Sequence, residues 1–117
     1  MLYMGYNGPN LAMGGGIAYL SSVCAPASYT RYKQSINCYG TSHSAMGQLL
    51  AHEIGHNLGM SHDFDPKHGG NYGPCNNQGI MSYNNPPHVW TTCSVSDFTS
   101  HYTAYRNSWC LPGTVAR

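Results

Sequence analysis

The stretch from His52 to His62 combines side chains that bind metals with one that moves protons. His52 and His56 stand four positions apart, so both imidazoles project from the same face if this stretch is helical. Two neutral imidazoles in that arrangement bind one Zn²⁺ through ring nitrogens at about 2.0–2.1 Å. Glu53 stands next to the first histidine, where its carboxylate reaches a water on the metal without being a ligand. The spacing therefore predicts a zinc site with an acid–base group beside it.

A third ligand is expected just beyond the end of this helix. Gly59 follows the last residue of the helical pattern, where a glycine with positive φ reverses the chain and returns His62 to the metal. Three histidine ligands leave one coordination position open for water, which is the arrangement of a catalytic rather than a structural zinc site. The other histidines have no partner at ligand spacing and are expected to be solvated at the surface. They are His43, His68, His88 and His101.

The element that must carry the first two histidines is a helix from Ser42 or Ser44 to Leu58. Serine is a favourable N-cap residue, and both serines precede the periodic residues. Apolar residues recur at helical spacing and predict one buried stripe along this helix. They are Ala45, Met46, Leu49, Leu50, Ile54 and Leu58.

Shorter elements are expected around this helix. Apolar and aromatic residues gather or alternate in three predicted strands, at Leu2–Tyr6, Ile17–Leu20 and Ser35–Tyr39. The stretch from Asp65 to Gln78 is rich in Gly, Asn and Pro and is expected to be a loop. A second helix is expected from about Ser94 to Asn107, with one apolar side formed by Val95, Phe98, Tyr102 and Tyr105.

Composition limits the class of protein. The 117 residues fit one small domain. With 5 Lys+Arg against 4 Asp+Glu and only 8% charged residues, the chain has no field that would attract nucleic acid or an anionic membrane. No apolar run approaches the ~20 residues of a membrane span. We therefore expect a folded domain with no nucleic-acid partner and no membrane span in this chain, either secreted or the ectodomain of a membrane-anchored protein, and nothing in the sequence fixes its oligomeric state.

The cysteines indicate an oxidising compartment. None of the five lies in a C-x-x-C pair, which disfavours a thiolate zinc ribbon or a redox motif, whereas wide and irregular spacing is typical of disulfides. Four of the five can pair in three ways, and the spacing does not choose among them. The fifth is then a free thiol or pairs with a part of the chain that is absent. The five are Cys24, Cys38, Cys75, Cys93 and Cys110.

The long zinc motif is followed by a methionine in a turn-rich region. Met81, within Gly79-Ile80-Met81-Ser82-Tyr83, stands 19 residues after His62. This combination resembles the metzincin metalloproteases, and the run from His56 to Asp63 looks most like their adamalysin or reprolysin group, which includes the ADAM and snake-venom metalloproteases. Further segments are similar to the edge strand and the C-terminal helix region of that group. They are Gly16–Leu20 with Cys24, Trp90–Ser94, and Trp109–Leu111.

The resemblance extends over roughly Gly14 to Leu111 and implies a fold. That fold is α+β, a metzincin-like zincin fold in truncated form. It has a short mixed sheet with an edge strand, a long zinc-binding helix, a Met-turn and a C-terminal helix. Residues 1–117 would form a single, partial catalytic domain, because almost none of the longer N-terminal part of such domains precedes Gly14.

The resemblance also implies a role for each matching residue. His52, His56 and His62 would be the ligands of one zinc ion, Glu53 the general base, and Met81 the hydrophobic floor beneath the metal. Asp63 would make a structural polar contact behind the third ligand. The substrate peptide would lie extended along Ile17, Ala18, Tyr19 and Leu20. A calcium site occurs in the family, but no acidic cluster here supports one.

The implied activity is that of a zinc endopeptidase that cleaves extracellular peptides or proteins through a metal-bound water. The implied disulfides are Cys24 with Cys110 and Cys75 with Cys93, and Cys38 has no assigned partner. Two alternatives remain: a non-catalytic extracellular binding module stabilised by zinc, and an astacin- or serralysin-like protease. The second is suggested by Tyr83, since Met81-Ser82-Tyr83 resembles the Met-x-Tyr in which tyrosine approaches the metal and stabilises an oxyanion; otherwise Tyr83 is a packed aromatic residue.

Overall fold

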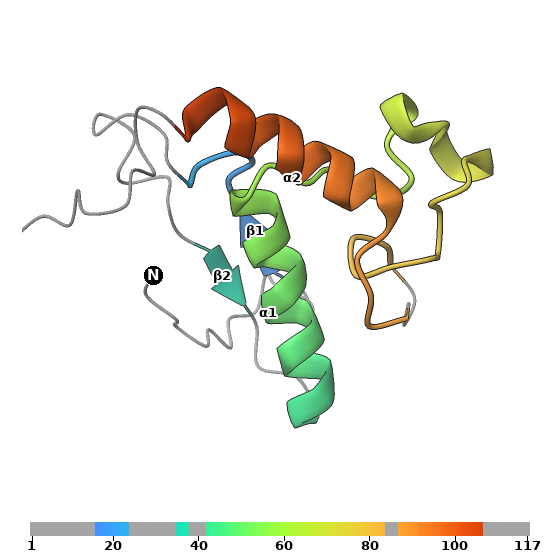
Figure 1. The fold of residues 1–117 in the computed structure, drawn as a ribbon. Helices are drawn as coiled ribbons and strands as arrows, with labels where there is room; N and C mark the ends of the chain where they lie inside the picture. The colour runs from blue at the N-terminus through green and yellow to red at the C-terminus, as the bar shows by residue number, and fades with distance from the viewer. Residues whose placement is uncertain (1–15, 24–34, 38–41, 84–86, 107–117) are drawn as a thin grey trace, which may run out of the picture.

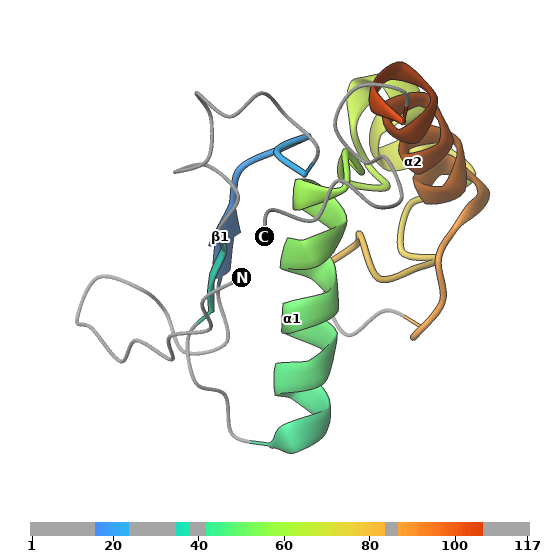
Figure 2. The ribbon, with the colours of Figure 1, turned by 60° about the vertical axis from the view of Figure 1, so that its left-hand side comes forward.

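The computed structural model describes residues 16–23, 35–37, 42–83 and 87–106. In these parts the element order is β1 (Gly16–Ala18), β2 (Ser35–Asn37), α1 (His43–Asn57), two 3₁₀ turns, and α2 (Thr92–Tyr105). Figures 1 and 2 show β1 alongside α1, with α2 lying across the C-terminal end of that helix. The coarse prediction of an α+β domain is therefore confirmed.

Helix α1 begins and ends close to where the sequence predicts. The Ser42 side chain accepts a hydrogen bond from the Ala45 N–H at 3.2 Å and caps the first turn. Leu58 is the C-cap, and Gly59 has φ +92, the left-handed conformation that a glycine adopts without strain. This reversal is what sends the following residues back along the helix.

The predicted apolar stripe of α1 is largely wrong. The side chains buried along this helix are Met46, His52, Glu53 and Asn57, together with Gly55. The other apolar residues expected in the stripe are half-buried or, at Ala45, exposed. Of the buried polar groups, His52 bonds to the Ile80 carbonyl and Asn57 to Tyr19 and Ser22, contacts with distant loop residues that hydrophobic periodicity does not reveal.

Strands β1 and β2 pair antiparallel, with Ile17 opposite Ile36. A mixed sheet was expected, but within the described residues the sheet consists of these two antiparallel strands. The strand predicted at Leu2–Tyr6 lies outside the described residues. Strand β1 ends at Ala18, so Tyr19 and Leu20 do not belong to the strand as predicted.

The chain turns away from strand geometry after β1 because the residues that follow it form hydrogen bonds with the end of α1. The Asn57 side-chain amide donates to the carbonyl oxygen of Tyr19 and to the hydroxyl of Ser22, both at 2.9 Å. The N–H groups of Ser21 and Val23 donate to the carbonyls of His56 and Asn57 at 2.8 and 2.9 Å. These carbonyls lie in the last turn of α1, where acceptors remain available, although the His56 carbonyl also accepts from the Gly59 N–H at 3.0 Å. The end of the helix is thereby capped and β1 is fixed against it.

Helix α2 packs through polar side chains as well. Thr91 caps it by accepting from the Ser94 N–H at 3.1 Å. The buried residues of α2 are Ser94 and His101, whereas Val95 and Tyr102 are exposed, so the predicted apolar side does not form its buried face. His101 bonds through Nε2 to the carbonyl of Val23 at 2.6 Å. A Cβ at Gly59 would come within 2.7 Å of the His101 Cβ, so glycine is required where the two helices meet.

The loop between the helices is anchored by a disulfide. It contains the 3₁₀ turns η2 (Pro66–His68) and η3 (Gly70–Tyr72). Cys75, in this loop, is bonded to Cys93 in the first turn of α2, so the bridge implied by the resemblance is present. Cys24 and Cys110 lie outside the described residues. Among the described residues, neither helix combines the length and apolarity needed to cross a bilayer.

Candidate metal centre

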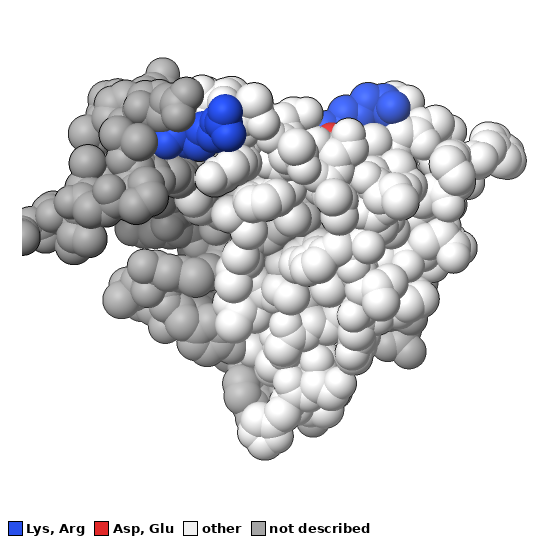
Figure 3. Space-filling view, viewed as in Figure 1, with Lys and Arg blue, Asp and Glu red and all other residues white. Residues whose placement is uncertain are grey.

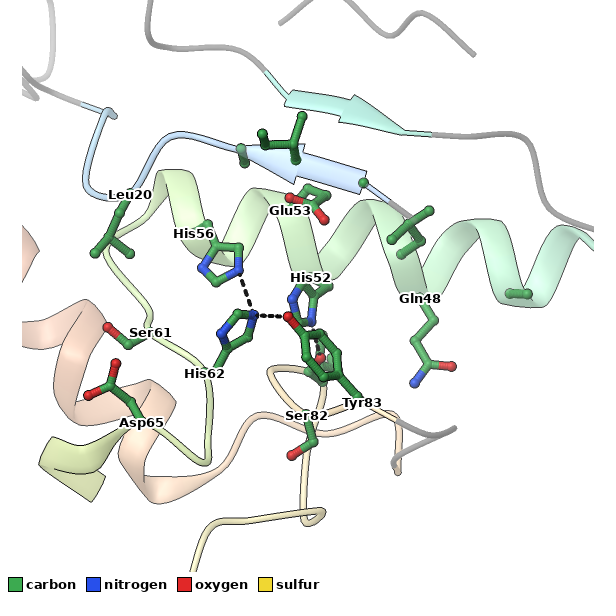
Figure 4. Close-up of a pocket in the computed structure, with 16 residues that line it drawn as sticks. Leu20, Gln48, His52, Glu53, His56, Ser61, His62, Asp65, Ser82 and Tyr83 are labelled. Atoms are coloured by element: carbon green, nitrogen blue, oxygen red, sulfur yellow. Dashed lines mark hydrogen bonds between the residues drawn. The ribbon is translucent and has the colours of Figure 1, made fainter. Parts of the chain in front are cut away.

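The three histidines of the predicted zinc motif come together at one point. The His52 and His56 rings, one turn apart on α1, have centroids 4.8 Å apart and are nearly perpendicular. The reversal at Gly59 brings the His62 ring to 5.2 Å from His52 and 4.7 Å from His56. Their ligand nitrogens all lie within 4.8 Å of one another. Figure 4 shows the three side chains grouped on one side of α1.

One pair of these nitrogens already has the spacing of zinc ligands. The Nε2 atoms of His56 and His62 are 3.2 Å apart. Ligand atoms about 2.0–2.1 Å from a tetrahedral ion lie about 3.3 Å from one another, so this pair needs almost no rearrangement.

His52 and His56 also have the tautomer that metal binding through Nε2 requires. His52 Nδ1–H donates to the carbonyl of Ile80 at 2.7 Å, and His56 Nδ1–H donates to the carbonyl of Met60 at 2.8 Å. Because a carbonyl only accepts, each proton sits on Nδ1 and the Nε2 lone pair is left for a metal. Burial lowers the pKa of both residues, and burial together with the two neighbouring imidazoles lowers the pKa of His62 to about 4. All three rings are therefore neutral at pH 7, as metal ligands must be.

Asp63 fixes the chain directly behind the third histidine. Its carboxylate is fully buried and accepts hydroxyl hydrogen bonds from Ser82 (2.9 Å), Thr91 (2.6 Å) and Ser94 (3.3 Å). Its N–H donates to the carbonyl of Met81 at 3.0 Å. One side chain thus joins the segment after His62 to the turn at Met81 and to the start of α2, a polar contact of the kind expected there.

A second acid, Asp97 on α2, holds the other side of the same segment. Its carboxylate accepts from the Ser61 N–H at 2.9 Å and pairs with the ammonium of Lys67 at 2.9 Å. His68 connects this carboxylate, at 3.2 Å, with the carbonyl of His62, at 2.9 Å. The peptide groups on both sides of the third ligand are thereby tied to α2.

Met81 lies beneath the helix that carries the first two histidines. It is fully buried, and a Cβ on Gly55 would stand 2.5 Å from its sulfur. Glycine at position 55 therefore lets the methionine approach the backbone of α1 between His52 and His56. The resemblance implies that Met81 forms the hydrophobic floor beneath the metal, and that role stays a prediction.

Glu53 lies between α1 and β1. It is 4% exposed, and among the residues that the structure describes its Oε2 atom has no hydrogen-bond partner. A Cβ on Gly16 would stand 2.6 Å from Glu53 Oε1, so the carboxylate fits only because β1 carries a glycine there. Burial raises the pKa of Glu53 to about 7. A carboxyl group with that pKa both accepts and releases a proton near neutral pH.

Tyr83 reaches the same centre from the turn after Met81. Its hydroxyl lies 3.0 Å from His62 Nε2, and its ring stacks on His52 with centroids 5.9 Å apart. Burial, together with the charge of Glu53, raises the pKa of the Tyr83 phenol, which therefore stays protonated at neutral pH. The residue is about half exposed, and Figure 4 shows it pointing toward the histidines.

A groove of about 830 Å³ passes over these side chains. One wall is β1 with the residues that follow it, another is α1, and a third comes from the turn that holds Ile80 and Tyr83. Leu20, Ser61 and Asp65 lie toward one end of the groove in Figure 4, and Gln48 lies toward the other. Ile17, Ala18 and Leu20 line it as well, whereas Tyr19 does not belong to the lining.

The sequence prediction failed for two of the four remaining histidines. His68 and His101 are not solvated: the first bridges Asp97 and His62, and the second is buried against Val23. His43 is exposed as expected, and His88 is exposed but bonds to the Gln48 side chain at 3.0 Å. Their partners are 6 to 78 positions away in the chain, so ligand spacing carried no signal for these contacts.

Sequence reasoning also missed the glycines at 16 and 55 and the polar residues Asn57 and Asp97. The sequence offers no signal for these two glycines except that each stands next to a residue with a predicted role. Nothing in the local pattern indicated the long-range bonds of Asn57 and Asp97.

The comparison with known families agrees with this geometry. Residues 8–114 match the model of the reprolysin (M12B) family of zinc metalloproteases. The match covers most of the chain, which therefore belongs to the reprolysin family, and the predicted resemblance is confirmed. The family binds zinc and has a metzincin fold, so an astacin- or serralysin-like assignment is set aside.

Proposed function

We propose that this chain is a zinc-dependent endopeptidase that hydrolyses peptide bonds of extracellular peptides and proteins. The observation that carries the proposal is the convergence of three neutral histidine nitrogens in a groove that Glu53 also lines. His52, His56 and His62 would hold the ion through Nε2. Zinc, when bound, supplies Lewis acidity, which lowers the pKa of water toward ~7 and polarises a carbonyl.

Glu53 is the proposed acid–base group. Its free Oε2 accepts a proton from the attacking water, and the protonated carboxyl then donates that proton to the nitrogen of the leaving amine. Its pKa of about 7 suits both halves of this exchange. Hydrogen bonds from neighbouring donors would hold Oε2 in one protonation state, so the lack of a partner at this atom supports the role.

The substrate would bind as an added strand. Strand β1 pairs with β2 on one side, and within the described residues its other edge has no strand partner and faces the groove. An extended peptide can pair with that edge through backbone hydrogen bonds, which fix its position without fixing its sequence. Asn57 supports this by holding the end of β1 against α1.

Tyr83 is proposed to donate its O–H to the oxyanion that develops on the peptide carbonyl. The phenol is protonated at neutral pH, and its oxygen lies within hydrogen-bond distance of a ligand nitrogen. A single donor of this type typically contributes about 10²–10³ in kcat. The Tyr83→Phe variant tests this role: we expect kcat to fall by about that factor while KM stays close to the wild-type value.

The extracellular setting is supported by the Cys75–Cys93 disulfide. Disulfides persist in oxidising compartments and are rare in the cytosol.

Zinc content and proteolysis, measured together, test the proposal. We expect one zinc per chain, cleavage of an unfolded protein such as casein, and loss of cleavage by about 10³-fold or more in Glu53→Gln with zinc content unchanged. The matched control is His43→Gln, because His43 is an exposed histidine in the same helix. Stoichiometric zinc without Glu53-dependent cleavage would instead identify a non-catalytic, zinc-stabilised module.

A further inference from the structure

Acidic side chains are scarce in this chain, and most of them already have partners or a proposed role. Figure 3 shows how few charged residues appear on one face of the molecule. Asp63 is bound by three hydroxyls, Asp97 pairs with Lys67 and His68, and Glu53 is the proposed base. The chain contains four acidic residues in all. Asp65 is the fourth, and its role is not accounted for by these contacts.

Asp65 lines the groove at the end where Leu20 and Ser61 lie (Figure 4). One carboxylate oxygen, Oδ1, accepts from the Lys67 N–H at 3.0 Å and caps the turn η2. The ammonium of Lys67 is turned to Asp97 at 2.9 Å. In the described part of the chain Asp65 therefore has no cationic partner, and Oδ2 accepts no hydrogen bond.

The described residues at the opposite end of the groove are uncharged. Ala45, Gln48 and Leu49 line it from the first half of α1. Apart from Glu53 beside the metal centre, Asp65 is the acidic group among the described lining residues, and the lining includes no lysine or arginine. A peptide bound along β1 thus meets a negative charge on one side of the metal centre and a neutral surface on the other.

We propose that Asp65 is a specificity-determining residue that selects peptides with a lysine or arginine on one side of the scissile bond, the side toward Leu20. A half-buried carboxylate in a groove interacts with a substrate cation more strongly than one in open water, and it accepts charge-assisted hydrogen bonds. This inference rests on the proposed function, because it assumes that peptides bind in this groove.

Binding to the Glu53→Gln chain loaded with zinc tests the inference without requiring turnover. Fluorescent peptides of alanine and leucine would carry either lysine or norleucine at successive positions, and their affinity would be measured by anisotropy. We expect lysine to improve affinity about three- to tenfold at positions on one side only, and less at high salt. Asp65→Asn should abolish the difference, since Asn retains the capping oxygen and loses only the charge.

Thr103→Lys is the control, because it makes the same change in net charge on the exposed side of α2 and should leave the lysine preference intact. The absence of a lysine preference at every position, or its persistence in Asp65→Asn, would overturn the inference. Peptide cleavage without that preference would overturn the role of Asp65 and leave the protease proposal standing. An Asp65-dependent preference in a chain that cleaves no peptide would support the role of Asp65 in binding and overturn the protease proposal.

Discussion

Glu53 and Asp63 are both buried carboxylates beside the metal centre, and their surroundings are opposite. Asp63 is fully buried and accepts hydrogen bonds from three hydroxyls and from no charged group. Glu53 is almost as buried, but one of its oxygens has no partner within the described segments. A buried charge with partners stabilises the fold, whereas one without partners costs free energy and is free to exchange a proton.

The difference distinguishes a carboxylate that stabilises the fold of the site from one proposed to transfer protons there. The contacts of Asp63 hold the third histidine, the Met81 turn and α2 together. Glu53, by contrast, packs closely against Gly16, and among the described residues no group bonds to its Oε2 atom. Substitutions at the acidic residues should therefore change the free energy of unfolding in different directions.

The largest expected effect is at Asp63. Asp63→Ala removes the acceptor from three buried hydroxyls and should lower the free energy of unfolding by about 3 kcal/mol or more. Asp63→Asn keeps one acceptor oxygen for Thr91 and Ser94, and should lose only about 1–2 kcal/mol. Urea denaturation of the zinc-loaded proteins measures both. Equal stability of Asp63→Ala and the wild type would remove the basis of the comparison.

The next effect has the opposite sign. Glu53→Gln replaces a poorly solvated carboxylate with a neutral amide of the same shape, and should raise the free energy of unfolding of the zinc-free chain by about 1–3 kcal/mol at pH 8. The same urea experiment in chelator measures it. A loss of stability on this substitution would show that the carboxylate is satisfied by its surroundings.

The smallest effect is expected at Asp97 and depends on pH. Burial alone would raise the pKa of Asp97, but hydrogen bonds from Lys67, Ser61 and His68 outweigh burial and lower it below its ordinary value of 3.8. Its contribution is therefore fully present above pH 3.8 and is lost as the pH falls through the lower, folded-state pKa. We expect Asp97→Asn to lose about 1 kcal/mol at pH 7 and the gap to the wild type to narrow below pH 3.8.

Thermal melts from pH 7 to pH 3 would measure that gap. A gap that stays constant over this range would mean that the charge of Asp97 contributes nothing.

The convergence of the three histidines could be predicted from sequence because its signals are local. The spacing of His52 and His56, the Ser42 cap and the turn at Gly59 all act within one helix and its end. The burial pattern could not be predicted, because polar residues such as Asn57 and His101 bond to segments 38 and 78 positions away. A hydrophobic pattern assumes that apolar faces are buried, and here hydrogen bonds between distant segments decide which face is protected.

The strand ends were missed for the same physical reason. Tyr19 and Leu20 continue the apolar pattern of β1, yet the side chain of Asn57 binds the Tyr19 carbonyl and ends the strand. Residue type and spacing predict the three histidines and Glu53, whereas they do not predict the glycines at positions 16 and 55.

The central claim is that His52, His56 and His62 bind a single ion. Isothermal titration calorimetry of Zn²⁺ into the metal-free chain tests this claim most directly. The account predicts one site per chain and a loss of affinity by about 100-fold or more in His62→Ala, with His43→Ala unchanged. Equal affinity in the wild type and His62→Ala, or no binding in either, would contradict it.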